Sequence, residues 1–147
     1  MPNNSIYMLH SSNPQNIGSI KEPTNIAEIK FDEHDKESHI TVYCTNESGK
    51  IKDLKYIAKA SIPVVASLSY LSVFLKGKKT SDALALQTSD VVSALSLPDH
   101  YHYCAKRALE AVHKAFQESD DPFDRAFKAV SKYNGPYTEN QPFGFED

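Results

Sequence analysis

The residues of this chain best suited to chemistry lie together in the segment 97–104, LPDHYHYC. His100, His102 and Cys104 alternate with tyrosines, and in an extended backbone alternate side chains point to the same side. Zinc and iron favour imidazole nitrogen and thiolate sulfur as ligands, so this spacing predicts a soft-metal site. A helical pattern begins near Cys104. Because the N-terminus of a helix lowers the pKa of a thiol, Cys104 is also a candidate reactive thiolate.

Few other residues offer chemistry. The chain has only two cysteines, and Cys44 alternates in phase with Ile40 and Val42, which predicts a place in the core. The pattern shows no nucleophile–base pair, no paired carboxylates and no phosphate-binding loop. We therefore expect that the protein is not an enzyme.

Alternating apolar residues predict the elements that would position Cys104. Strands are expected at 27–31, 40–44 and 51–58, joined by a charged turn at 32–37 and a hairpin turn at 46–49. Three consecutive strands joined by short turns form an antiparallel meander.

Helices are expected after the strands. Apolar residues with a 3.6-residue period predict a long helix from the capping residue Ser61 to the stop at Gly77. Two shorter helices are expected at 80–86 and 89–97, and a last long helix at about 104–117. Strands followed by helices indicate an α+β fold with the helices packed on one face of the sheet.

The C-terminal region has a separate pattern. We expect one domain at 1–117, followed by a helix and a polar, aromatic tail at 118–147. The tail contains Tyr137, Phe143 and Phe145 in an otherwise polar stretch. Two interpretations remain open: the extension covers more of the core, or it docks on a partner or on a second copy to form a homo-oligomer.

Composition narrows the class of protein. A length of 147 residues suits one domain, and 40% hydrophobic with 24% charged residues predicts a globular protein. A net charge of −3 without a basic stripe argues against nucleic acid as a partner. The chain has no apolar run long enough to span a membrane and no secretory signal at its start. Two cysteines do not make a disulfide framework, so we expect a reducing, cytoplasmic location.

Three stretches together resemble one known family. Residues 97–112, LPDHYHYCAKRALEAV, resemble a Leu-Pro-Pro-x-Lys-x-His-Cys signature that runs into a helix. Residues 7–18, YMLHSSNPQNIG, resemble Tyr-x-x-His-x-x-Asn-Pro-x-Asn-x-Gly. Residues 49–67 and 74–78 follow the order of hairpin, long helix and Lys-Gly-Lys turn. On these motifs the chain resembles NifU/IscU-type iron–sulfur cluster scaffold proteins over roughly residues 5–116.

The resemblance implies a NifU/IscU-like, SufE-like domain with a scaffold-like role in iron–sulfur cluster assembly, alongside a cysteine desulfurase or other assembly proteins. Such scaffolds hold iron or zinc with three cysteines helped by an aspartate. By spacing, the third cysteine corresponds to Cys104 and the second to Ser61. The first falls in the turn that holds His34 and Asp35. A serine hydroxyl retains its proton far more tightly than a thiol, so a conventional [2Fe–2S] cluster is not expected.

Three interpretations of the function stay open. Cys104, with His34 and either His102 or His100, could bind zinc or iron(II), with Asp35 or water completing the set. Cys104 could instead accept a persulfide from a cysteine desulfurase. Alternatively, the chain is a degenerate paralogue that binds no metal and acts as an interaction or regulatory module.

Overall fold

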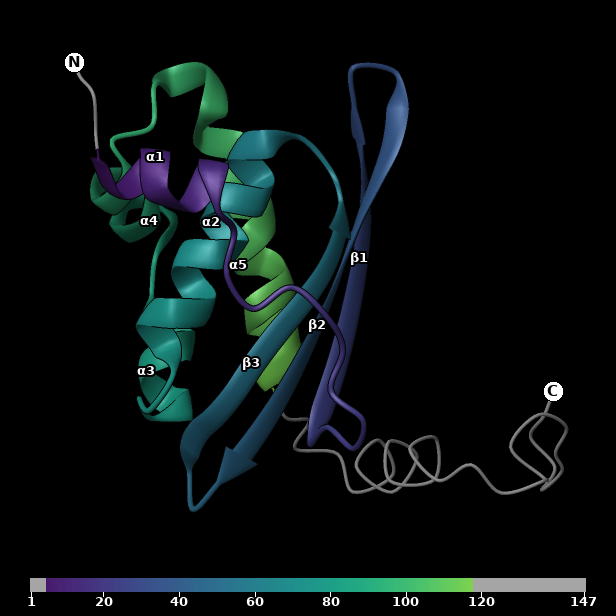
Figure 1. Cartoon of the computed structure of the whole chain (residues 1–147), viewed down its shortest axis with the longest axis vertical. Helices are drawn as coiled ribbons and strands as arrows, with labels where there is room; N and C mark the ends of the chain where they lie inside the picture. Colours follow the sequence, from purple (N-terminus) through teal and green to yellow (C-terminus); the bar gives the residue numbers. More distant parts are fainter. Residues whose placement is uncertain (1–4, 118–147) are drawn as a thin grey trace, which may run out of the picture. The chain divides into compact units, whose positions relative to one another are not determined.

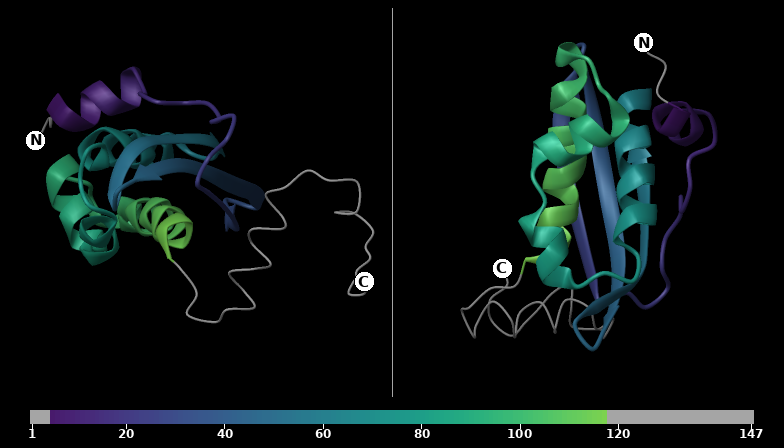
Figure 2. Two further views of the ribbon diagram at one scale, coloured as in Figure 1. Left: turned by 90° about the horizontal axis from the view of Figure 1, so that it is seen from below. Right: turned by 90° about the vertical axis from the view of Figure 1, so that its left-hand side faces the viewer.

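The computed structural model describes residues 5–117, so the predicted C-terminal helix and tail lie outside the described residues. In chain order the elements are α1 (Ser5–Ser12), β1 (Asn25–Glu33), β2 (Lys36–Glu47), β3 (Lys50–Lys59), α2 (Ile62–Leu75), α3 (Thr80–Ala85), α4 (Thr88–Leu95), a 3₁₀ turn η1 (Asp99–Tyr101) and α5 (His102–Phe116). The strands form one antiparallel sheet in the order β1-β2-β3. Helices α2 and α5 pack on one face of it (Figures 1 and 2). The predicted α+β meander is confirmed.

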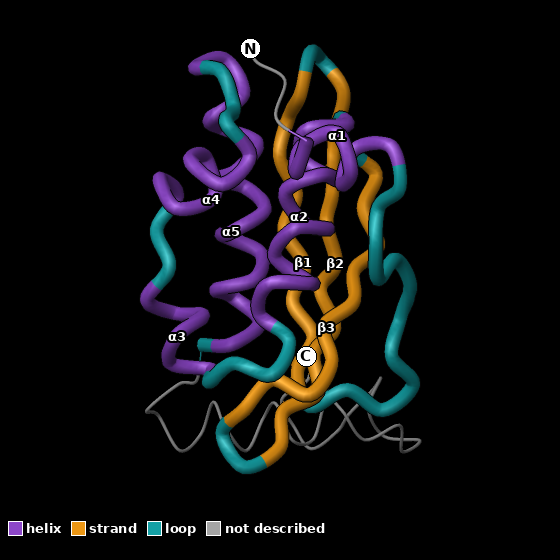
Figure 3. Tube along the Cα trace, turned by 60° about the vertical axis from the view of Figure 1, so that its left-hand side comes forward, coloured by secondary structure: helices purple, strands orange, loops and turns teal. Residues whose placement is uncertain are grey.

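Both hairpins reverse direction over two residues. Glu33 pairs with Lys36, and the intervening residues 34 and 35 both have a positive φ, at 51° and 67°. Residues 48 and 49 form the second turn, with φ of 55° and 77°. Such left-handed two-residue turns match the twist of the strands they join. The strands therefore extend further toward both turns than the sequence predicted, and the two hairpins reach opposite ends of the sheet (Figure 3).

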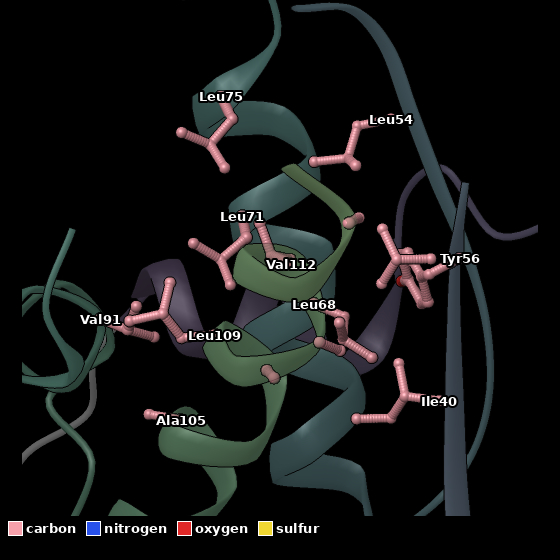
Figure 4. Close-up of a cluster of buried hydrophobic side chains, with 14 of the residues drawn as sticks. Ile40, Leu54, Tyr56, Leu68, Leu71, Leu75, Val91, Ala105, Leu109 and Val112 are labelled. Carbon is pink, nitrogen blue, oxygen red and sulfur yellow. The ribbon is translucent and has the colours of Figure 1, made fainter. Parts of the chain in front are cut away.

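The core lies between the sheet and the two long helices (Figure 4). Its labelled members come from the strands (Ile40, Leu54 and Tyr56), from α2 (Leu68, Leu71 and Leu75), from α4 (Val91) and from α5 (Ala105, Leu109 and Val112). Helix α2 contacts α1, α5 and β3, and for this reason it is buried along most of its circumference. Cys44 is fully buried in the sheet, as predicted. None of the helices within residues 5–117 is long and apolar enough to cross a membrane.

The N-terminal segment is held against α2 and β3 by specific hydrogen bonds. The buried His10 imidazole lies 2.6 Å from the hydroxyl of Ser69, so this histidine anchors the segment to α2. Asn16 donates from its side chain to Ser72, and its carbonyl accepts from the backbone of Tyr56 at the edge of the sheet. Polar residues that look like a loop in the sequence therefore pack along the domain.

Candidate functional site

Three elements meet at the end of the sheet where β1 turns into β2. Strand β1 ends there at Glu33, α2 begins after Ser61, and the first turn of α5 supplies Tyr103 and Cys104. The side chains of these residues contact one another. The site that the sequence placed around Cys104 is therefore a place where distant segments converge, and its centre is a carboxylate.

Glu33 is buried, with 7% of its surface exposed. It continues the alternation of Ala27, Ile29 and Phe31, so its side chain points to the face covered by helices. Because the hairpin turn occupies only residues 34 and 35, β1 stays regular up to Glu33 and keeps this direction. The strand pattern thus places a carboxylate inside the fold.

Four hydrogen bonds satisfy the Glu33 carboxylate. Its Oε1 accepts from the hydroxyl of Ser38 at 2.7 Å and from the backbone amide of Ser61 at 2.9 Å. Its Oε2 accepts from the hydroxyl of Ser61 at 2.7 Å and from the phenol of Tyr103 at 2.6 Å. Burial by itself would raise the pKa of Glu33, but the donors from Tyr103, Ser61 and Ser38 outweigh it, and the pKa lies below its usual value. Glu33 is therefore ionised near neutral pH.

Ser61 has a different role from the one its position suggests. It stands at the N-cap of α2, but its hydroxyl makes no capping hydrogen bond to the helix and donates to Glu33 instead. Tyr103 closes the cluster from the outside, with 36% of its surface exposed. Burial and the hydrogen bond donated to Glu33 raise the pKa of Tyr103, so the phenol keeps its proton.

Cys104 lies on the inner side of this cluster. Its side chain is fully buried, and its Sγ lies 3.9 Å from the hydroxyl of Ser61. Burial raises the pKa of the thiol, and the negative charge of Glu33 raises it further, while hydrogen bonds from Tyr103 and Ser61 act in the opposite direction. The expected low-pKa thiolate is therefore wrong for this conformation: burial outweighs the position at the start of a helix.

The shared direction of His100, His102 and Cys104 depended on an extended backbone at 97–104, and the structure does not have one. Residues 99–101 form the 3₁₀ turn η1, and α5 begins at His102, two residues earlier than predicted. In an α-helix residues two apart point to nearly opposite sides, so His102 and Cys104 diverge. His102 lies 3.2 Å from the carbonyl of Leu97, and the ring of the exposed His100 lies 4.3 Å from that of Tyr101 at a tilt of 52°.

The remaining predicted ligands lie in the β1–β2 turn. His34 and Asp35 are both exposed, with left-handed backbone angles that fit the turn. Within residues 5–117, no three His, Cys, Asp or Glu side chains gather closely enough to hold a metal ion. The structure thus brings Ser61 to Cys104 but does not gather His102, His34 and Asp35 around them, and the mixed-ligand site stays a prediction.

The donor set can be tested against a cluster by its chemistry. Iron–sulfur clusters require thiolate ligands, and this site offers one buried, protonated thiol. The Glu33 carboxylate has donors on both oxygens, and the other neighbours are hydroxyl groups, which are poor ligands. The residues present do not fit a conventional [2Fe–2S] cluster.

The burial of Glu33 could have been predicted from the sequence if residues 32 and 33 had been assigned to the strand and not to a charged turn at 32–37. Glu33 follows Ala27, Ile29 and Phe31 in strict alternation, and an acidic residue on the apolar face of a strand needs buried partners. The hydrogen-bond partners of Glu33 could not be predicted from the local sequence. Ser61 and Tyr103 lie 28 and 70 residues away from Glu33 along the chain.

Comparison with known proteins gives consistent matches. A family model described as NifU-like N terminal domain matches residues 4–121. The chain is 30% identical over 109 residues to the "Iron-sulfur cluster assembly protein IscU" of Plasmodium falciparum, covering 74% of this chain and 67% of that protein. It is 26% identical over 112 residues to the "Iron sulfur cluster assembly protein 1, mitochondrial" of Debaryomyces hansenii, covering 74% of this chain but only 63% of that relative.

Solved structures share the fold. The N-terminal part of a nitrogen-fixing NifU-like protein from Brucella abortus superposes with a TM-score of 0.61 at 20% identity, over 76% of this chain and 90% of that one. A protein from Fervidobacterium islandicum AW-1, assigned as a cluster assembly scaffold of the SUF system, gives a TM-score of 0.61 at 13% identity, over 78% and 96% of the two chains. With the family model matching 118 of its 147 residues, this chain belongs to the NifU-like N-terminal domain family.

Proposed function

We propose that this chain works in iron–sulfur cluster assembly as a member that holds no cluster itself and serves the assembly machinery as an interaction or regulatory module. The family and the printed names of its relatives support the pathway. The single observation that carries the modified role is the Glu33 carboxylate, saturated by four hydrogen bonds where the segments that would supply ligands converge.

In this proposal the hydrogen bonds of Glu33 close the fold in place of a metal. They join the end of β1, the start of α2 and the start of α5, which are the segments whose residues match the family's ligand positions. A bound metal would tie the same segments together through coordination. Because the carboxylate makes these ties internally, the domain keeps its surface for partner proteins such as a cysteine desulfurase while the site remains closed.

Reconstitution with a matched pair of variants tests the absence of a cluster. The purified protein is incubated anaerobically with iron(II) and sulfide, and separately with zinc, and its metal content is measured. We expect the wild type to retain no stoichiometric metal. Ser61→Cys adds a thiol beside Cys104 and Glu33, a set of ligands that suits zinc, so this variant is expected to gain zinc. Ser67→Cys places the extra thiol elsewhere on α2 and is expected to gain none.

A binding measurement tests the module role. Calorimetry with purified cysteine desulfurase, with and without added iron, is expected to show an iron-independent complex. Stoichiometric iron or a cluster on the wild type would overturn the proposal. A protein that binds neither the desulfurase nor any other cluster-assembly protein would overturn it as well.

A persulfide at Cys104 is the second candidate. The thiol itself is fully buried, and the partly exposed Tyr103 beside it is the side chain that would have to move for a desulfurase persulfide to reach the sulfur. The thiol would first lose its proton, then attack the terminal sulfur of a desulfurase persulfide, and the desulfurase thiolate would leave. Incubation with desulfurase and ³⁵S-cysteine distinguishes a persulfide acceptor from a module that takes up no sulfur. Label that is lost in Cys104→Ala and kept in Cys44→Ala supports transfer, and an unlabelled protein excludes it.

A further inference from the structure

The end of the fold opposite Glu33 carries a group of five exposed lysines, which we call the lysine tip. They come from the start of β3 and from the turn between α2 and α3: Lys50, Lys52, Lys76, Lys78 and Lys79. The two segments lie side by side at the β2–β3 hairpin (Figures 1 and 3). Segments 24 or more residues apart in the chain thus build one charged surface.

Backbone hydrogen bonds fix the two halves of the lysine tip relative to each other. The amide of Ile51 donates to the carbonyl of Lys78 at 2.8 Å, and the amide of Gly77 donates to the carbonyl of Ile51 at 2.7 Å. The amide of Thr80 donates to the carbonyl of Gly49 at 3.0 Å. Gly77 has a φ of 88°, which favours glycine, so the turn is built for this geometry. The lysines are therefore presented on a rigid frame, which lowers the entropy cost of binding.

The arrangement places like charges close together. Lys50 and Lys79 are direct partners in an antiparallel bridge, and like charges opposite each other destabilise such a pair. Two carboxylates at the edge of the tip relieve part of the charge, because Glu47 lies 3.7 Å from Lys52 and Asp53 lies 3.6 Å from Lys76. Among residues 5–117, no ion pair to Lys50, Lys78 or Lys79 is formed. An anionic partner would neutralise these three.

We propose that the lysine tip docks an acidic protein segment that also carries an apolar side chain. The apolar contact is Phe74, a partly exposed residue at the end of α2 with the Lys78 ammonium 4.4 Å from its ring. The whole chain has a formal net charge of −3, so without these five lysines the remainder carries −8. An extended polyanion such as duplex DNA or an anionic bilayer would meet that negative remainder, whereas a short acidic segment contacts the tip alone.

A fluorescein-labelled peptide of alternating glutamate and leucine serves as the probe, and fluorescence anisotropy measures its affinity for the full chain. We expect saturable binding that weakens as salt is raised. The Lys50→Gln, Lys79→Gln double variant should lose about tenfold in affinity, because each exposed ion pair contributes up to about fivefold. Lys30→Gln, Lys59→Gln removes the same charge from exposed lysines of β1 and β3 and should lose much less.

Three results would overturn the proposal. Equal losses in the two double variants would mean that only net charge matters. No saturable binding by the wild type would remove the docking site. Tighter binding of a labelled DNA duplex or of phosphatidylserine vesicles, lost in the Lys50→Gln, Lys79→Gln variant, would assign the tip to nucleic acid or to a membrane. None of these readouts involves Glu33, so failure here leaves the proposed function standing.

Discussion

Replacing Glu33 with glutamine tests whether the buried carboxylate holds the site closed. The substitution keeps the size of the side chain but removes its charge and turns one accepting oxygen into a donating amide nitrogen. Two hydrogen bonds to the remaining oxygen lose their charge assistance, and the hydroxyls of Ser61 and Tyr103 must reorient to accept. A hydrogen bond to a charged group contributes about 1.5–3 kcal/mol, and one between neutral groups about 1 kcal/mol.

Summed over four bonds, with partial rescue by reorientation, the expected loss is about 2–4 kcal/mol in the free energy of unfolding. For a domain of this size that corresponds to a fall of roughly 8–15 °C in Tm. Urea denaturation followed by circular dichroism measures the first quantity and calorimetry the second. Glu37→Gln, an exposed carboxylate at the start of β2, is the matched control and should change stability by less than about 0.5 kcal/mol.

The pH dependence gives an independent check with a definite sign. The pKa of Glu33 is lower in the folded chain than its ordinary value of 4.5. Its ionised form therefore adds stability that is fully present above pH 4.5 and is lost as the pH falls through the lower folded value. The difference between wild type and Glu33→Gln should shrink over that acidic range. The reasoning would be refuted if Glu33→Gln were as stable as Glu37→Gln at pH 7. It would also be refuted if the difference in unfolding free energy between wild type and Glu33→Gln did not change at acidic pH.

Three further outcomes are expected. Tyr103→Phe removes one charge-assisted donor and should cost about 1–2 kcal/mol in urea denaturation, and an unchanged midpoint would show that the phenol does not support Glu33. Cys104 in the folded protein should react with iodoacetamide at pH 8 far more slowly than in urea, because the thiol is buried and its pKa is raised. Mass spectrometry measures the rate of alkylation, and equal rates in the two conditions would contradict the burial. Lys79→Gln should raise Tm slightly by removing the like-charge pair with Lys50, while Lys59→Gln should not, and calorimetry on both variants decides.

Periodicity predicted most of the fold because the pattern and the burial agree locally. The three strands, the long helix after Ser61 and the buried Cys44 all follow from apolar spacing. For the segment 97–104, the shared direction inferred for the histidines and Cys104 did not occur. The alternation of tyrosines and histidines suggested a strand, but Pro98 followed by the acidic Asp99 is a pattern typical of a helix start.

The candidate site was less predictable for a physical reason. The family resemblance related Ser61 to Cys104, and the two side chains lie 3.9 Å apart because each stands at the start of a regular helix. Next to Ser61 and Cys104, the residue expected from the β1–β2 turn was His34, but the structure has Glu33 there. The turn contains only two residues, so β1 stays regular up to Glu33 and the side chain of His34 is exposed. A shift of one residue along a strand moves a side chain to the opposite face of the sheet. The local sequence pattern does not define the length of a turn to within one residue.

The residues around Glu33 depend on one another, and this dependence bears on the role of the protein. A buried carboxylate without partners is strongly unfavourable, so Glu33 is tolerable only with the donors supplied by Ser38, Ser61 and Tyr103. Conversely, the buried hydroxyl of Ser38 would lose its acceptor if Glu33 were lost. Glu33→Gln combined with Tyr103→Phe should therefore destabilise by about 1 kcal/mol less than the two single losses added together. Strict additivity would mean that these groups are independent neighbours, and the proposal that hydrogen bonds to Glu33 close the site would lose its support.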